Sequence, residues 1–470
     1  MNLQISRRQL LQSLGNGFGV LALAGVLEDA GLLASEVGSG KHLVGDDLAP
    51  RPGHFPGKAK AVIQLFQNGG PSQMDLLDNK PELSRHNGQP HPDPGVFETL
   101  NQSGNRNVLM GTAFQFAHYG QCGMELSELL PHIAGAADDL CLLRSMHTEH
   151  NNHPFAISMM QTGKTFAGRP AMGSWICYGL GSENWNLPGY VVLRDPAGYN
   201  TSGKTVWSNG WLPAVYQGTE FSSAGTPVLY MDPARPRSAQ ARARSQACLS
   251  VLNDAHLLGH PGESELEARV QLEATDALDL SSETEATRKL YGLDNPVTAG
   301  YGTRCLMARR LVEAGVRFVQ VFPPVGQPWD HHAQLISALK TICDKTDHGS
   351  AALIRDLKLR GLLDKVIVMW TGEFGRLPIT QGADGRDHNR NAFSLLMAGG
   401  GFKAGHIHGE TDEFGYRSIK DRVSVPDLHA TILHQLGIDH TRLSYVHGGR
   451  PERLTDPEVT GAGVVEELLV

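Results

Sequence analysis

The sequence predicts an α/β protein, and three features indicate this fold class. Short apolar runs typical of buried strands occur at 61–66, 140–143, 316–322 and 366–370. Helical periodicity over 333–362 separates the last two runs, and a strand–helix–strand unit of this kind is expected to be parallel and right-handed. Polar and ionisable residues follow the carboxyl ends of these strands, where ligands bind in open α/β sheets.

The composition is that of a globular protein able to bury a sizeable core. Of the 470 residues, 40% are hydrophobic and 19% are charged. The formal net charge of −8 and the lack of a basic block argue against a nucleic-acid partner. Six scattered cysteines without a CxxC pair argue against a zinc ribbon or a disulfide-dense scaffold, whereas 21 histidines raise the expectation of metal binding.

The N-terminus has the pattern of an export signal. Arg7 and Arg8 precede a weakly hydrophobic run, 14–26, that contains a small-residue cleavage pattern. This resembles a twin-arginine signal, and an ordinary amphipathic helix is the alternative. No segment is long enough to predict a transmembrane span, so we expect a periplasmic or otherwise exported protein. The expected division of the chain is a signal over 1–35, a linker over 36–60 and one domain over 61–470, with a helical insertion around 235–293.

A glycine turn follows the first strand. Because glycine lets a ligand approach the backbone, Asn68, Ser72 and Asp75 in this turn are candidate site residues. The alternative is that they only form and cap the turn. Further along, we expect a surface loop over 80–120 and an amphipathic helix over 126–133.

A dense group of histidines follows the strand at 140–143. His147, His150 and His153 lie within one short stretch together with Glu149. Imidazole and carboxylate groups directly after a buried strand suit a metal or oxyanion site. Surface histidines on a polar loop are the alternative.

Polar residues at the ends of the later strands are expected to converge. Asp330 and His332 follow the strand at 316–322, while Glu373 and His388 follow the strand at 366–370. Parallel strands would bring all four to one edge of the sheet.

The three residues Asp330, His332 and His388 form an oxygen/nitrogen/nitrogen set for a divalent cation that leaves a position open for water or substrate. Such an ion would polarise a phosphoryl or sulfuryl oxygen, and Glu373 would hold a second ion or orient the first. Arg376 and Arg386 are expected to clamp an oxyanion. Ion pairs within a polar loop, 386–389, are the alternative.

Six segments resemble one family: NGGPSQMDLLD, NNHPFAISMMQTG, WDHH, TGEFGR, GRDHN with the following AGGG, and DLHATILHQLGIDH. They are similar to a large family of exported bacterial proteins known as domain of unknown function fifteen-oh-one, from about residue 58 to the C-terminus. That family in turn resembles the alkaline phosphatase and sulfatase superfamily. The resemblance implies a three-layer α/β/α fold with a mixed, largely parallel central sheet.

The superfamily resemblance also implies residue roles. The metal-binding acid of the first strand would fall on Asn68 or Asp75, and the nucleophile position falls near His153. Later metal positions fall on Asp330, His332, the pair Glu373-Phe374, and His388. Two departures stand out: no Ser, Thr or Cys occupies the nucleophile position, and Phe374 replaces a ligand. A covalent intermediate is therefore not expected, and His153 would act as a ligand or as the nucleophile.

The leading interpretation is an exported, metal-dependent hydrolase-like protein acting on sulfate or phosphate esters of small molecules or glycans. Its divalent ion would be Zn, Mn or Ca. The alternative is a non-catalytic metal- or glycan-binding member of an envelope complex with a degenerate site. An oxidoreductase lacks support because the sequence has neither a Rossmann fingerprint nor CxxCH. The expected metal ligands are Asp75, Asp330, His332, Glu373 and His388, and the expected catalytic residues are His153, Arg376 and Asp387.

Overall fold

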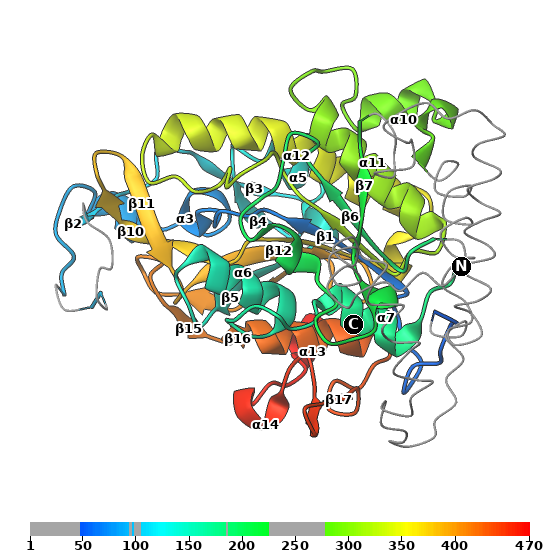
Figure 1. The fold of residues 1–470 in the computed structure, drawn as a ribbon. Coiled ribbons are helices and arrows are strands. Elements are labelled where there is room, and N and C mark those ends of the chain that lie inside the picture. The colour runs from blue at the N-terminus through cyan, green and yellow to red at the C-terminus, as the bar shows by residue number, and fades with distance from the viewer. Residues whose placement is uncertain (1–47, 94–95, 98–104, 185–186, 225–277) are drawn as a thin grey trace, which may run out of the picture. The chain divides into compact units, whose positions relative to one another are not determined.

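The computed structural model describes residues 48–470 except 94–95, 98–104, 185–186 and 225–277 (Figure 1). The expected signal, about half of the expected linker and most of the expected helical insertion lie outside these residues. A nine-stranded sheet dominates the described part, in the order β13-β5-β12-β9-β1-β8-β6-β7 with β16 beside β5. Within it, β12 runs antiparallel to β5 and β9, and the other pairings are parallel. The mixed, largely parallel central sheet is confirmed.

The strands of this sheet are short and mostly buried. Their bounds are β1 Ala61–Phe66, β5 Leu140–His147, β6 Tyr190–Arg194, β7 Thr219–Ser222, β8 Phe318–Val321, β9 Val366–Thr371, β12 Phe393–Ala398, β13 His406–His408 and β16 Val423–Ser424.

Strand β1 shows how the sheet separates two apolar cores. Ile63 and Leu65 belong to one cluster of buried side chains, and Val62 and Phe66 belong to the other, as the two-residue period of a strand requires. Both faces of the sheet are covered by helices (Figure 1), which explains why all six residues of β1 are buried. The three-layer arrangement predicted from the sequence is present.

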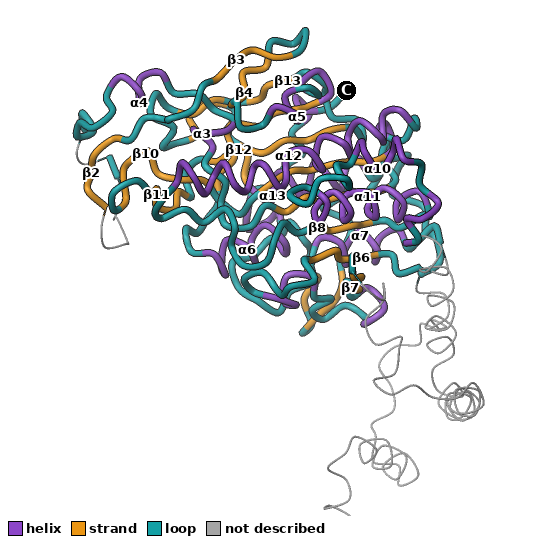
Figure 2. Tube along the Cα trace, turned by 90° about the horizontal axis from the view of Figure 1, so that it is seen from above, coloured by secondary structure: helices purple, strands orange, loops and turns teal. Residues whose placement is uncertain are grey.

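Helices cover each face of the main sheet. Figure 2 shows α11 and α12 side by side along the sheet. The helices of the first face are α5 Pro131–Ala134, α10 Glu285–Leu290, α11 Ala299–Glu313 and α12 Leu335–Leu359, and those of the second are α6 His153–Thr162, α7 Met172–Leu180 and α13 Val425–Gln435. Within the described residues, no helix combines the length and apolar character that crossing a bilayer requires.

A second, antiparallel sheet carries part of the candidate site. It consists of β2 Asn105–Leu109, β10 Gly375–Gln381 and β11 Gly385–Asn389. The prediction of a polar loop over 386–389 is therefore wrong. Leu377 and Ile379 of β10 pack into a third apolar cluster, which buries this hairpin.

Two other predicted segments differ from the structure. The expected loop over 80–120 contains α4 Pro81–Arg85, β2 and β3 Phe116–Tyr119. The expected helix over 126–133 is wrong, because β4 Met124–Ser127 pairs with β3 and helix α5 starts only at Pro131. The remaining short elements are α3 Gln73–Leu76, β14 Glu410–Thr411, β15 Ser418–Lys420, β17 Tyr445–His447, β18 Arg450–Glu452, α14 Pro457–Thr460, and 3-10 turns at 137–139, 203–207, 214–216, 280–282, 363–365 and 466–468.

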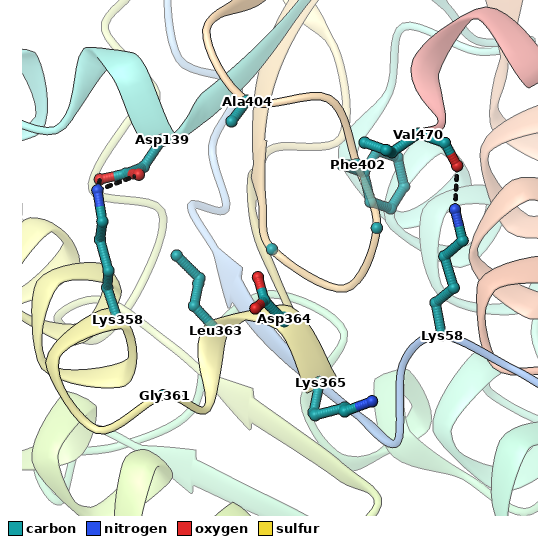
Figure 3. Close-up of a pocket in the computed structure, with 12 residues that line it drawn as sticks. Lys58, Asp139, Lys358, Gly361, Leu363, Asp364, Lys365, Phe402, Ala404 and Val470 are labelled. Atoms are coloured by element: carbon teal, nitrogen blue, oxygen red, sulfur yellow. Dashed lines mark hydrogen bonds and ion pairs between the residues drawn. The ribbon is translucent and has the colours of Figure 1, made fainter.

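A cavity of about 610 Å³ lies at the amino ends of β1 and β9 (Figure 3). Lys358 and Asp139 form an ion pair at its wall, with 2.6 Å between Nζ and Oδ1, and Lys58 contacts Val470. The amino ends of parallel strands lie opposite the edge at which ligands bind. This cavity is therefore separate from the residues that the sequence analysis selected.

His429 of α13 is a buried histidine outside any group of acids. Its Nε2 donates a hydrogen bond to the carbonyl oxygen of Met160 at 2.9 Å. Burial lowers the pKa of His429 to about 4, so the folded protein holds this side chain neutral. The unfolded chain takes up a proton below about pH 6.5. The folded state therefore keeps its stability above that pH and loses it as the pH falls toward 4.

Substituting His429→Gln, which keeps a donor for Met160, should remove this part of the acid sensitivity. Between pH 7 and pH 5 the wild type should lose about 2 kcal/mol more unfolding free energy than the variant. Urea unfolding of both proteins at the two pH values measures the difference. Equal losses would show that His429 is not held neutral by its burial.

Candidate metal centre

The residues of the candidate centre come from the start of one helix, one loop and one hairpin at the carboxyl edge of the main sheet. His153 opens α6 after β5, and Asp330 and His332 lie between β8 and α12. His388 lies on β11, directly across the hairpin from Arg376 on β10. Because β5, β8 and β9 run parallel, their ends meet at one edge.

Four side chains meet at this edge: His153, Asp330, His332 and His388. Their candidate ligand atoms all lie within 4.8 Å of one another. Oδ1 of Asp330 lies 2.9 Å from Nε2 of His332 and 3.1 Å from Nε2 of His388. Oδ2 of Asp330 lies 3.2 Å from Nε2 of His153. Three of the four were predicted as ligands, and His153, expected to be catalytic, joins them.

The far nitrogen of each imidazole is held by an oxygen. Nδ1 of His153 lies 2.7 Å from Oε1 of Glu373, and Nδ1 of His388 lies 2.7 Å from the carbonyl oxygen of Asn151. Nδ1 of His332 contacts Oε1 of Gln381. Each Nδ1–H is thus directed outward and each Nε2 inward, which is how metal-ligating histidines are oriented in proteins.

A buried nitrogen without a hydrogen bond supports the same interpretation. Nε2 of His153 is buried, and although it lies 3.2 Å from Asp330, the two groups are not aligned as a hydrogen bond. A buried polar atom without a partner calls for a specific explanation. Three inward Nε2 atoms and one carboxylate are a donor set that suits a divalent transition metal.

The close packing of ionisable groups around Asp330 shifts the pKa values of the centre. Burial works to raise the pKa of Asp330, but the three imidazoles around its carboxylate and the charge of Arg376 hold that pKa well below its usual range. Burial also works to lower the pKa of His153. The neighbouring carboxylates of Asp330 and Glu373 nevertheless raise this pKa to about 9. A metal ion would compete with that proton, because metal binding needs neutral imidazole.

A family model described as "Protein of unknown function (DUF1501)" matches residues 59–469. The chain belongs to this family. The match starts two residues before β1 and includes the whole centre, so the resemblance inferred from the motifs is confirmed. No curated protein matches the sequence.

Several solved structures are similar to this DUF1501 chain. The lipoteichoic acid synthase LtaP from Listeria monocytogenes is 10% identical over 84% of this chain and 77% of its own, with a TM-score of 0.36. A protein in the alkaline phosphatase superfamily from Vibrio parahaemolyticus is 11% identical over 86% and 72%, with a TM-score of 0.36. The PsFucS1 sulfatase from Pseudoalteromonas sp. is 11% identical over 81% and 68%, with a TM-score of 0.32. The identities and TM-scores are low, so no residue role is carried over from these proteins.

Two carboxylates predicted as ligands have other partners in the DUF1501 chain. Glu373 is fully buried, and both of its oxygens accept the Gly69 N–H, at 2.9 and 3.0 Å, while Oε1 also binds His153. It therefore orients a ligand rather than joining the four. Asp75 is paired with Arg386, with 2.8 Å between Oδ2 and Nε, and lies outside the group.

The expected anion clamps are also corrected. Arg376 is 1% exposed and binds Asp330 through Nη2 at 2.6 Å, so it is enclosed by protein. Arg386 is 0% exposed and forms an ion pair with Asp75. Asp387 is buried and accepts the backbone N–H of His388 at 2.7 Å, and it is not one of the four. Ion pairing, the alternative considered for the two arginines, describes them better than an anion clamp does.

Gly69 allows the two halves of the centre to approach closely. Its φ is +117°, and a Cβ there would lie 2.7 Å from the backbone nitrogen of Asp330. A side chain at this position would displace the Asp330 loop. The glycine turn was expected to let a ligand approach the backbone, whereas in the structure it lets the Asp330 loop approach.

Proposed function

We propose that the chain is an exported, metal-dependent hydrolase that acts on sulfate or phosphate esters of small molecules or glycans. The observation that carries the proposal is the convergence of three imidazoles on Asp330. Each imidazole is held at Nδ1 by an oxygen and directs Nε2 toward Asp330. A divalent ion held there would supply a Lewis acid that polarises the ester oxygen and acidifies water. The motif resemblance to the alkaline phosphatase and sulfatase superfamily supports the substrate class, and the Arg7-Arg8 pattern supports export.

The chain's own residues determine how substrate reaches the ion and which ion is taken. The His332 side chain is 31% exposed, whereas those of His153 and His388 are 10% and 5% exposed. Substrate therefore approaches from the His332 side. Three nitrogen donors favour zinc or a similar transition metal over calcium, which prefers oxygen ligands.

A second candidate function follows from the number of ligands. Four protein groups fill a tetrahedral zinc site, as in structural centres, whereas catalytic zinc sites usually keep three. No hydroxyl or thiol of the described residues hydrogen-bonds to the four side chains. Both points favour a chain that binds metal without turnover, as a member of an envelope complex.

Metal content and ester hydrolysis, measured on the full chain, separate these functions. The wild type should carry close to one equivalent of a divalent transition metal by mass spectrometry, and His388→Ala should lose it. His434→Ala removes a partly buried histidine of α13 whose ring centroid lies 4.9 Å from that of Phe55. His434 is not one of the four, so this variant should keep the metal.

The ester panel then decides about catalysis. Metal-dependent release of nitrophenol from p-nitrophenyl sulfate or phosphate, absent in His388→Ala, would support the hydrolase. Bound metal without turnover would favour the second function. No bound metal in the wild type would overturn both.

A further inference from the structure

The guanidinium of Arg376 lies beside the centre in an enclosure of oxygen atoms. Nε donates to the Gly70 carbonyl at 2.8 Å, and Nη2 binds Oδ1 of Asp330 at 2.6 Å. In total, its nitrogens contact carbonyl oxygens of Gly69, Gly70, Trp329 and Arg386 and the carboxylate of Asp330. With 1% of Arg376 exposed, this charge is held inside the protein.

Four carbonyl oxygens and a carboxylate are the kind of ligands that hard cations take from proteins. In this chain the side-chain cation of Arg376 occupies them. The neighbouring buried acids are also engaged: both oxygens of Glu373 accept the Gly69 N–H, and Asp75 is paired with Arg386. The ring of Phe374 lies 4.8 Å from that of His153 and 4.5 Å from that of His388, centroid to centroid.

We propose that the centre holds one divalent ion only, because Arg376 permanently fills the adjoining oxygen-lined cation site. This inference rests on the metal binding of the proposed function and adds the number of ions and the role of Arg376. Arg376 is a positioning residue. It holds Oδ1 of Asp330 from the hairpin, opposite His388 in register, and joins the loop after β1 to the Asp330 loop. A mechanism that needs two metal ions is then excluded.

Cobalt titration followed by visible absorption tests the proposal on the full chain. The wild type should saturate at one equivalent of Co²⁺. Arg376→Ala should bind Co²⁺ about 10- to 100-fold more weakly, because loss of a partner that orients a ligand costs about that much. Guanidinium ion at low millimolar concentration should enter the vacated enclosure and restore the affinity and the spectrum, and sodium chloride at equal ionic strength should not.

Arg304→Ala is the matched control. Arg304 is 2% exposed, is paired with Asp195 and donates to the Phe322 carbonyl, outside the group of four. Its removal should leave the cobalt affinity and spectrum unchanged and insensitive to guanidinium. If Arg376→Ala does not fold, Arg376→Lys keeps the charge and should still bind one equivalent, with a shifted spectrum.

The outcomes separate this inference from the proposed function. Two equivalents of Co²⁺ in the wild type would overturn the inference and leave the hydrolase standing. Weak binding by Arg376→Ala that guanidinium does not restore would overturn the role of Arg376. One equivalent without ester hydrolysis would support the inference and remove the hydrolase, whereas no binding at all would overturn both.

Discussion

Substituting Asp330→Asn should lower the affinity of the centre for a divalent transition metal by more than about 100-fold. Loss of a residue that only orients a ligand already costs about 10- to 100-fold, and Asp330 is the one carboxylate among the four ligand candidates. Its oxygens face Nε2 of all three histidines. Asparagine has the same shape as aspartate and can still accept a hydrogen bond from Arg376, so the variant should fold. The lower metal affinity should come from the missing negative charge and the weaker donor atom.

A graded series makes this prediction sharper. Glu373→Gln keeps an acceptor for Nδ1 of His153 but loses the charge, so its affinity should fall by about 10- to 100-fold. Asp384→Asn is the control. Asp384 accepts the backbone N–H of Gln334 at the start of α12 and lies outside the four, so its substitution should leave the affinity unchanged. Competition titration against a chromogenic chelator measures all three.

The order of the series is the informative result. If Asp330→Asn bound metal as tightly as Asp384→Asn, the four side chains would be an internal ion-pair cluster and not a metal centre. If Glu373→Gln bound metal more weakly than Asp330→Asn, Glu373 would be a metal ligand, as expected from the sequence.

Four strands of the main sheet, β1, β5, β8 and β9, and the convergence of polar residues at their carboxyl ends could be predicted from the sequence. The run 366–370 and the periodicity over 333–362 correspond to β9 and α12, and β8 precedes them as expected. His388 reaches this edge on β11, in a hairpin that was not predicted. For Asp330 and His332 the parallel strands are sufficient, because chain direction alone determines which strand ends meet. That reasoning needs no knowledge of side-chain contacts.

The partners of those residues could not be predicted in the same way. Arg376 and Arg386 are ten positions apart and look alike in the sequence, yet one binds Asp330 and the other binds Asp75. The difference comes from the register of the β10–β11 hairpin, which was expected to be a loop. The Asn151 carbonyl that holds His388 is a backbone group, and backbone groups carry no sequence signal.

The wrong helix over 126–133 has a related cause. Leu126, Leu130 and Ile133 are spaced as on a helix face, and all three are buried. In the structure Leu126 lies on strand β4, Leu130 directly precedes helix α5, and Ile133 lies on α5. The three side chains are therefore buried without a common helix. Spacing over about two helical turns does not distinguish these possibilities. Pro131 is a local sign of the true helix start, because proline is favoured at the first helical position.

Asp75→Ala should lower the free energy of unfolding by about 3–5 kcal/mol, because it leaves the Arg386 charge buried without its partner. Asp75 and Arg386 are 1% and 0% exposed at their side chains, with Nε and Oδ2 2.8 Å apart. Arg386 also donates to the Met110 carbonyl at 2.9 Å. Urea unfolding of the metal-free proteins measures the loss without a contribution from a bound ion.

Two comparisons distinguish this structural role from the ligand role expected for Asp75. Lys340→Ala breaks an exposed pair with Asp344 on α12, 2.8 Å apart, and should cost less than about 1 kcal/mol. The double variant Asp75→Leu with Arg386→Met should be more stable than Asp75→Ala, because removing both charges leaves neither one buried alone. A ligand role would give a different pattern: Asp75→Ala would lose metal at nearly unchanged stability. The pair joins the β10–β11 hairpin to helix α3 and so supports the segment that carries His388. Stability and metal affinity should therefore be measured on the same samples.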